Sequence, residues 1–159
     1  MFEILENYDQ QDNFEFTLVD NLKKQCNAPD DCCGIYIVYG YFGNKEKIIY
    51  IGSSGHIKDG EAIHRKGGLR RRIVGKQQKT PRGKLWPMKM RELSIDKLKI
   101  HWCDTKEDNP LLVEYCLILE FVIQNKRLPL WNHELKLSRE LKTEFELFVK
   151  NNNIESLKV

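Results

Sequence analysis

The chain has 159 residues, of which 41% are hydrophobic and 31% charged, and its net charge is +3 at neutral pH. This length favours one domain whose core needs no disulfide or structural metal. The five cysteines contain no Cys-x-x-Cys pair, so we expect reduced thiols rather than a zinc site, and the lack of a long apolar run or a secretory leader predicts a cytoplasmic protein without membrane contact.

The positive charge is concentrated in the middle of the chain. Residues 58–91 contain twelve lysines and arginines against two acidic residues, whereas residues 1–33 contain eight acidic residues and two lysines. A field of one sign confined to one segment is typical of a protein that binds a polyanion. The alternative is a solvated basic surface that has no ligand.

No repeat, low-complexity segment or linker divides the chain, so we expect a single domain over residues 1–159. Its functional core is predicted to cover about 33–133, with an N-terminal extension over 1–32 and a helical C-terminal extension over 134–159. Within the first extension, residues 14–25 favour a short amphipathic helix.

A β-hairpin is predicted next. Residues 33–39 and 47–52 are rich in β-branched and aromatic residues, and turn formers separate them. If the hairpin is symmetric about Gly43, Tyr36 lies opposite Tyr50, and both phenols share one face of the sheet. The alternative is that each tyrosine is an ordinary strand aromatic that packs on the core.

The basic segment is predicted to contain a helix over residues 69–78. Leu69 and Ile73 are spaced to be buried together, while Arg72 and Lys76 stand one turn apart on another face. Two like charges at this spacing repel each other, and a phosphate bound between them would relieve the repulsion.

Three further elements follow. Residues 97–103 alternate polar and apolar side chains and favour a half-buried strand. Asn109 and Pro110 are typical of an N-cap and a first helical position, and they open an apolar helix that extends to about residue 125. Residues 138–150 favour a last amphipathic helix.

The apolar helix carries two acidic residues, Glu114 and Glu120. They are six positions apart and therefore point some 120° from one another, so we expect one of them to face inward. An inward carboxylate is costly when it is ionised and alone, which makes either residue a candidate metal ligand. The alternative is that each is a surface glutamate or is paired with a lysine.

Two phenols beside a cation field and an inward carboxylate form a set suited to phosphodiester cleavage. A cation held by the carboxylate can neutralise developing charge, an arginine can stabilise the five-coordinate phosphorus, and a tyrosine can activate water if nearby cations lower its pKa.

The residues Gly34-Ile35-Tyr36 and Tyr50-Ile51-Gly52, with the spacing of the other parts up to residue 132, resemble the GIY-YIG nuclease superfamily. The resemblance implies an α/β (α+β) fold with a small three-stranded antiparallel sheet flanked by helices. It also implies cleavage of DNA with a single divalent cation, Mg²⁺ or Mn²⁺.

By this resemblance, Tyr50 matches the general base and Tyr36 the tyrosine that assists it. Leu69-Arg70-Arg71-Arg72-Ile73 resembles the segment that supplies the catalytic arginine, here Arg72. The second glutamate of the apolar helix matches the metal ligand, which favours Glu120 over Glu114. Pro129-Leu130-Trp131-Asn132 resembles the closing motif, in which Asn132 ties the Glu120 helix to the site.

The chain departs from the family pattern in three ways. Lys76 stands where the family usually has tyrosine or histidine, and Ser53 stands where the repair branch usually has lysine. About twelve additional residues, which include His56 and His64, separate Tyr50 from Arg72, and this insertion is more like the restriction-enzyme branch.

The sequence thus predicts a divalent-metal-dependent DNA endonuclease, of restriction type and acting as a homodimer. The expected catalytic residues are Tyr36, Tyr50, Arg72, Lys76, Glu120 and Asn132, with Glu120 as the metal ligand. The expected DNA-contacting residues are Ser53, His64, Arg65, Lys66, Arg70 and Arg71. The alternatives are a non-catalytic nucleic-acid-binding module and a structure-specific repair or homing-type nuclease.

Overall fold

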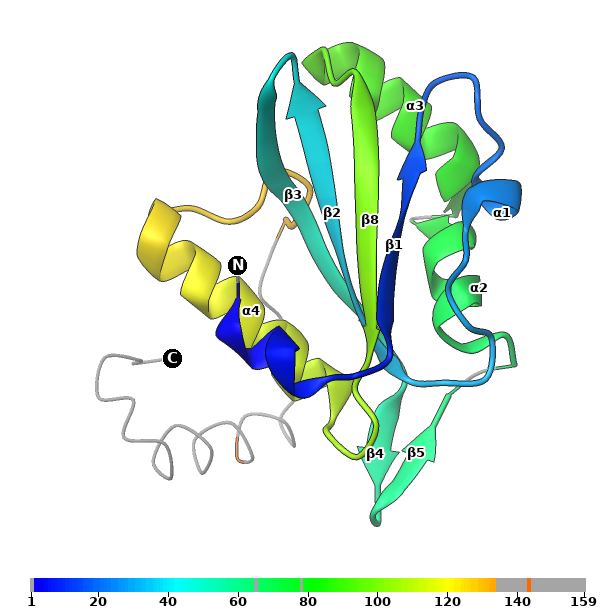
Figure 1. Cartoon of the computed structure of the whole chain (residues 1–159), viewed down its shortest axis with the longest axis vertical. Coiled ribbons are helices and arrows are strands. Elements are labelled where there is room, and N and C mark those ends of the chain that lie inside the picture. The colour runs from blue at the N-terminus through cyan, green and yellow to red at the C-terminus, as the bar shows by residue number, and fades with distance from the viewer. Residues whose placement is uncertain (1, 65, 78, 134–142, 144–159) are drawn as a thin grey trace.

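The computed structural model describes residues 2–64, 66–77, 79–133 and 143. Its centre is a four-stranded antiparallel sheet with the strand order β1-β8-β2-β3 (Figure 1). These strands are β1 (Gln11–Phe16), β2 (Gly34–Phe42), β3 (Lys45–Ser54) and β8 (Lys97–Asp104). Two small two-stranded sheets are formed by β4 (His56–Lys58) with β5 (Glu61–Ile63) and by β6 (Lys76–Gln77) with β7 (Thr80–Pro81).

Helices cover both faces of the large sheet, which makes the described part of the chain an α+β fold (Figure 1). On one face lie the 3₁₀ helix η1 (Glu3–Asn7) and the helix α4 (Pro110–Asn125). On the other face lie α1 (Leu22–Gln25), α2 (Gly68–Val74) and α3 (Arg82–Leu93). Within the described residues, none of the helices combines the length and the apolar character needed to cross a bilayer.

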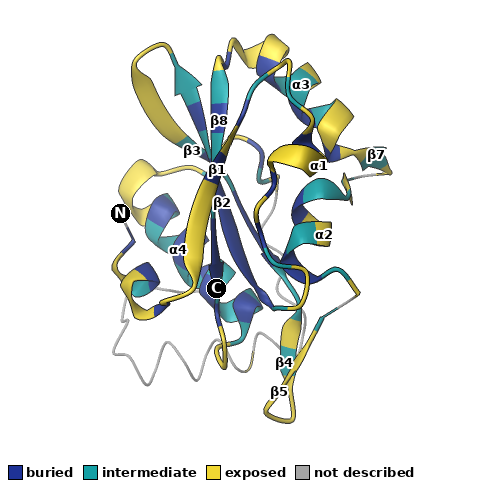
Figure 2. Ribbon diagram, turned by 45° about the vertical axis from the view of Figure 1, so that its right-hand side comes forward, coloured by how far each residue is buried: buried dark blue, intermediate teal, exposed yellow. Residues whose placement is uncertain are grey.

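The strand β2 lies inside the sheet and is buried on both faces, as the dark blue ribbon of Figure 2 shows. Because side chains alternate along a strand, Tyr36 and Val38 belong to the cluster under α2 and α3, whereas Ile35 and Ile37 belong to the cluster under α4. One strand therefore contributes to two cores, and its orientation fixes which residues face each helical layer.

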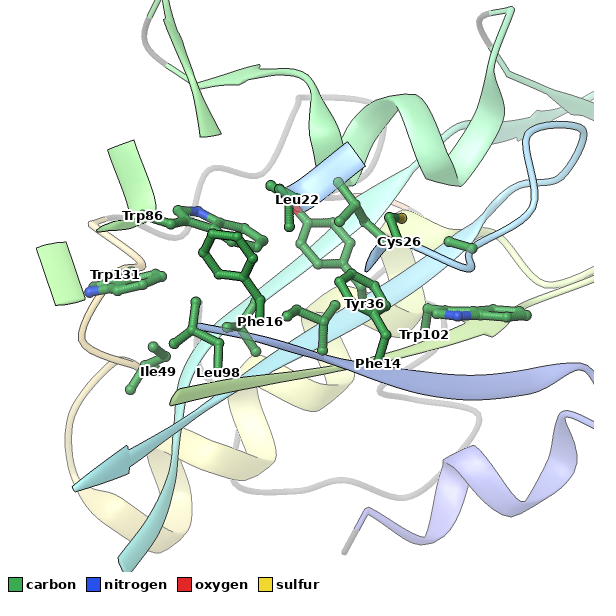
Figure 3. Close-up of a cluster of buried hydrophobic side chains, with 14 of the residues drawn as sticks. Phe14, Phe16, Leu22, Cys26, Tyr36, Ile49, Trp86, Leu98, Trp102 and Trp131 are labelled. Atoms are coloured by element: carbon green, nitrogen blue, oxygen red, sulfur yellow. The ribbon is translucent and has the colours of Figure 1, made fainter. Parts of the chain in front are cut away.

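Large aromatic side chains fill the cluster between the sheet and α3 (Figure 3). Trp86 of α3 is 1% exposed, and its ring centroid lies 6.4 Å from that of Phe16 and 6.1 Å from that of Trp131. Burial of each such side chain contributes roughly 1.5–3 kcal/mol. Phe16 comes from β1 and Trp131 from the segment after α4, so this cluster joins both ends of the described chain to α3.

The predicted hairpin is present, but its predicted register is wrong. Tyr36 pairs with Gly52, and Tyr50 pairs with Val38. The register shifts between Val38 and Tyr39, where Ile49 is the extra residue of a β-bulge. The two tyrosines are consequently diagonal neighbours, two positions apart, and still share one face of the sheet.

The strand predicted over 97–103 and the helix predicted from Pro110 to about 125 are confirmed as β8 and α4. The side chain of Asn109 accepts a hydrogen bond from the backbone N–H of Leu111 at 3.2 Å, as expected of an N-cap. The helix predicted over 138–150 lies, apart from residue 143, outside the described residues.

Three expectations about the elements are wrong. Residues 14–25 form the end of β1 and the short α1 rather than one helix, because Phe14 and Phe16 alternate into the core opposite β8. The large sheet therefore has four strands rather than three. The helix predicted over 69–78 ends at Val74, because Gly75 adopts an extended conformation and Lys76 begins β6.

Substitution of Gly34 by alanine should strongly destabilise the protein. A methyl group at this position would lie 2.1 Å from the carbonyl oxygen of Cys103 in β8, and backbone cannot move aside as a side chain can. We expect Gly34→Ala to lower the free energy of unfolding by about 3 kcal/mol or more in urea titrations.

The matched control is Gly83→Ala in α3, where the new methyl group would meet only Cβ of Leu22 at 3.8 Å. Alanine favours a helix by roughly 0.5–1 kcal/mol over glycine, so this variant should be slightly more stable than the wild type. Equal stability of the two variants would contradict the close approach of β2 to β8.

Candidate functional site

Two phenol rings form the centre of the candidate site. The ring centroids of Tyr36 and Tyr50 lie 5.6 Å apart, with Tyr36 fully buried and Tyr50 partly exposed. Gly52 leaves room for both rings, because a methyl group there would lie 2.6 Å from Cε1 of Tyr50 and 2.9 Å from Cζ and the hydroxyl oxygen of Tyr36. The glycine after the second tyrosine is thus required by packing.

Arg72 reaches this site from the last turn of α2. The Tyr36 phenol is the chief cause that raises the pKa of Arg72, and Tyr50 and Glu114 raise it further. Partial burial opposes the increase but does not cancel it. The Tyr36 hydroxyl is buried and has no hydrogen bond of standard geometry to another described residue. Arg72 therefore provides positive charge next to both phenols, and the residue as a whole keeps contact with solvent.

The carboxylate of the site belongs to Glu114 rather than Glu120. Ser53, at the end of β3, donates a hydrogen bond from its hydroxyl to the Glu114 carboxylate. Burial raises the pKa of Glu114, while the Ser53 hydrogen bond and the Arg72 charge oppose the increase. The charge of Glu114 also raises the pKa of Tyr50, which indicates that this carboxyl lies near the phenol pair.

Glu120, the residue expected to hold the metal, lies elsewhere, and that expected role stays a prediction. Glu120 accepts a hydrogen bond from Nε2 of Gln124 at 3.1 Å and lines a pocket of about 500 Å³ together with Tyr39 and Lys99. That pocket opens on the α4 side of the sheet, away from the face that carries Tyr36 and Tyr50. The expected divergence of the two glutamates holds, but the residue that faces the tyrosines is the first of them.

The surroundings of Tyr50 disfavour its ionisation. The pKa of Tyr50 is raised far above its usual value, first by the charge of neighbouring Tyr36, then by burial and by Glu114, while Arg72 and Arg82 lower it. At neutral pH the Tyr50 hydroxyl therefore carries its proton. Additional positive charge would be needed to make this phenol a base.

Asn132 fixes the backbone between Tyr50 and Gly52. Its side-chain oxygen accepts a hydrogen bond from the N–H of Ile51 at 3.0 Å, and its amide nitrogen donates to the Ile51 carbonyl at 2.8 Å. The backbone N–H of Trp131 donates to the carbonyl of Ile49 at 2.8 Å. The segment after α4 thus pairs with the outer edge of β3 and satisfies groups that an edge strand would leave open.

The residues expected to contact DNA fall into different structural settings. Ser53 is 5% exposed and engaged by Glu114, so its expected role in DNA contact is not supported by its position. The guanidinium of Arg70 donates to the carbonyls of Lys23 (2.6 Å) and Cys26 at the end of α1, which occupies it within the fold.

The neighbouring cations differ from Arg70. Arg71 is exposed, and its guanidinium donates to the carbonyl of Lys66, itself an exposed residue, at 3.0 Å. Lys76 is exposed but lies on β6 beyond α2, so it is not on the same helix face as Arg72. His64 is partly exposed, and Arg65 lies outside the described residues.

Sequence reasoning missed one charged residue near the site, Arg82. Its side chain is 2% exposed at the start of α3, and its charge lowers the pKa of Tyr50. In the sequence it is one of twelve basic residues in a cationic segment, and no spacing distinguishes it from the solvated ones.

No protein-family model, no curated protein and no solved structure matches this chain.

The environment of Glu114 predicts how stability changes with pH. The pKa of this carboxyl is higher in the folded chain than the usual value near 4.3, so its protonated form stabilises the fold. That stabilisation is complete below the unfolded pKa and is lost as the pH rises through the folded pKa. In urea titrations from pH 4 to 8, Glu114→Gln should remove this dependence and be more stable than the wild type at pH 7.

The control is Glu120→Gln on the same helix, which should change the free energy of unfolding by no more than about 0.5 kcal/mol at any of these pH values. A Glu114→Gln variant that is less stable than the wild type at pH 7 would show that Arg72 and Ser53 hold the carboxyl in its ionised form.

Proposed function

We propose that the chain is a divalent-cation-dependent DNA endonuclease of the GIY-YIG type. The observation that carries the proposal is the convergence of Tyr36, Tyr50, Arg72 and Glu114, which come from β2, β3, α2 and α4. Each of these residue types has a separate task in phosphodiester hydrolysis. The tripeptides around the two tyrosines and the basic segment that follows support the same assignment.

Glu114 is suited to hold a divalent cation. Mg²⁺ in proteins is commonly bound through one or two carboxylates, with water and substrate phosphate in its other positions. Burial disfavours the ionised form of Glu114, so a positive partner would stabilise it. Among the described residues no group of three or more His, Cys, Asp or Glu side chains is placed to hold a metal, which fits one carboxylate rather than a closed cage.

In the proposed mechanism, Arg72 stabilises the charge that develops on the phosphate as water attacks in line. A cation held by Glu114 would supply positive charge at the phosphate oxygens. Tyr50 would orient the attacking water and, once added positive charge such as that of the cation has favoured loss of its own proton, would accept the water proton as a phenolate. Tyr36 packs against Tyr50 and keeps Arg72 directed at the site. Asn132 maintains the backbone that carries Tyr50.

DNA backbone contacts are assigned to the exposed cations near α2. Arg71 and Lys66 are joined by a hydrogen bond and remain accessible, and Lys76 lies shortly after the end of the same helix. Charge neutralisation at these positions would position the duplex without reading its sequence. We further propose restriction-type cleavage by a cytoplasmic homodimer.

A non-catalytic DNA-binding module is the second candidate. The strongly raised pKa of Tyr50 favours it, because a phenol that keeps its proton cannot act as a base without further positive charge. The two candidates differ in one respect: a binding module has no need of the Glu114 carboxylate.

Cleavage assays separate them. With Mg²⁺ or Mn²⁺, the wild type should cut plasmid DNA, and Tyr50→Phe should cut it about 10²- to 10⁴-fold more slowly. Glu114→Ala should lose metal-dependent cutting yet bind DNA as the wild type does. Glu120→Ala is the matched control and should retain activity; loss of activity in this variant with full activity in Glu114→Ala would assign the metal to Glu120 instead.

Arg70 and Arg71 are adjacent in the sequence but should give opposite results. Arg71→Ala should weaken DNA binding and reduce the slope of log affinity against log salt by about 1, because one phosphate contact is lost. Arg70→Ala should leave that slope unchanged and lower the free energy of unfolding by roughly 1–3 kcal/mol, because two carbonyls of α1 lose their donor. Fluorescence anisotropy over a salt series and urea titration measure the two effects.

A further inference from the structure

Arg82 carries a buried charge that no acidic residue in the described part of the chain compensates. The side chain is 2% exposed, and none of the ion pairs among the described residues includes it. Its Nε is buried without a hydrogen-bonding partner in the described part of the chain. A guanidinium buried in this way is costly, so its position requires a compensating role.

One such role is at the end of α2. That helix stops at Val74, and its last carbonyls lack the partners that a further turn would provide. Nη1 of Arg82 donates to the carbonyl of Arg72 at 2.5 Å and to that of Lys76 at 3.4 Å, and the Arg82 backbone N–H donates to the Gly75 carbonyl at 2.8 Å. A residue of α3 therefore caps α2, with positive charge at the negative end of the helix.

The capped carbonyl belongs to the residue whose side chain faces the phenols. When Arg82 holds the backbone of Arg72, it also limits where the Arg72 guanidinium can move. Among the described residues, Tyr36 from β2 and Glu114 from α4 raise the pKa of Tyr50, whereas Arg72 from α2 and Arg82 from α3 lower it.

We propose that Arg82 is a positioning residue of this site: it fixes the last turn of α2 so that Arg72 faces the tyrosines. The positioning rests on contacts within the chain, whereas its effect on cutting rests on the proposed nuclease function. The residue acts through Arg72 and does not itself contact the substrate.

The test compares Arg82→Met, which removes the charge and the hydrogen bonds, with Arg82→Lys, which keeps the charge but cannot reach the same carbonyls. Arg91→Met, at an exposed arginine near the end of the same helix, is the control. For each full-length variant we would measure amide hydrogen exchange over residues 69–76, DNA affinity, and kcat with Mg²⁺.

Arg82→Met should exchange the α2 amides at least about tenfold faster than the wild type, with β2 and β8 unchanged. Its kcat should fall at least about tenfold with DNA affinity little changed, because Arg72 loses its position while the DNA-contacting cations stay. Arg82→Lys should also exchange faster and cut more slowly, and Arg91→Met should match the wild type throughout.

Wild-type exchange over residues 69–76 in Arg82→Met would overturn the proposal. If that variant does not fold, Arg82→Lys decides it, since unchanged exchange over 69–76 in the lysine variant contradicts the capping role. If the wild type does not cut DNA, the nuclease assignment fails, while the exchange data still establish or refute the positioning of α2.

Discussion

The bulge at Ile49 determines the arrangement of the candidate site. A register shift of one residue turns every side chain of a strand to the other face, so the position of the extra residue decides what lies beside Tyr36. Because the bulge precedes Tyr50, Gly52 rather than Ile51 lies directly opposite Tyr36, and the two tyrosine rings lie diagonally across the space that a Cβ of Gly52 would fill. Asn132 then holds Ile51 from the outer edge and prevents the strand from slipping.

The electrostatics of the site follow from this packing. The pKa of Tyr50 is raised, first by neighbouring Tyr36 and then by burial, and burial also raises the pKa of Glu114. The pKa of Arg72 is raised as well, because the phenols and the carboxyl stabilise its charge. The two arginines therefore supply the positive charge of the site, and positive charge at this place favours the binding of an anion such as phosphate.

Local patterns in the sequence were sufficient to predict the hairpin, β8 and α4. Turn formers mark the hairpin, polar–apolar alternation marks β8 and an N-cap marks α4, and each of these signals acts over a few residues. They were insufficient for β1, because its polar residues conceal an edge strand with only Phe14 and Phe16 buried, and for α3, which contains Gly83 and Pro87. The angle between Glu114 and Glu120 could be calculated, but the side on which α4 packs could not. That choice depends on contacts between Ser53 and Glu114, which are 61 residues apart.

The early end of α2 determines the setting of Lys76. Since the helix stops at Val74, the side chain at position 76 belongs to β6, is exposed and stands outside the phenol cluster. Its backbone carbonyl nevertheless accepts a hydrogen bond from Arg82, so the residue contributes to the site through its main chain. The buried positive charge comes instead from α3, and a lysine at 76 is free to meet a polyanion in solvent. The setting of Lys76 thus depends on the shape of the segment that follows α2 and on Arg82, the buried arginine six residues later.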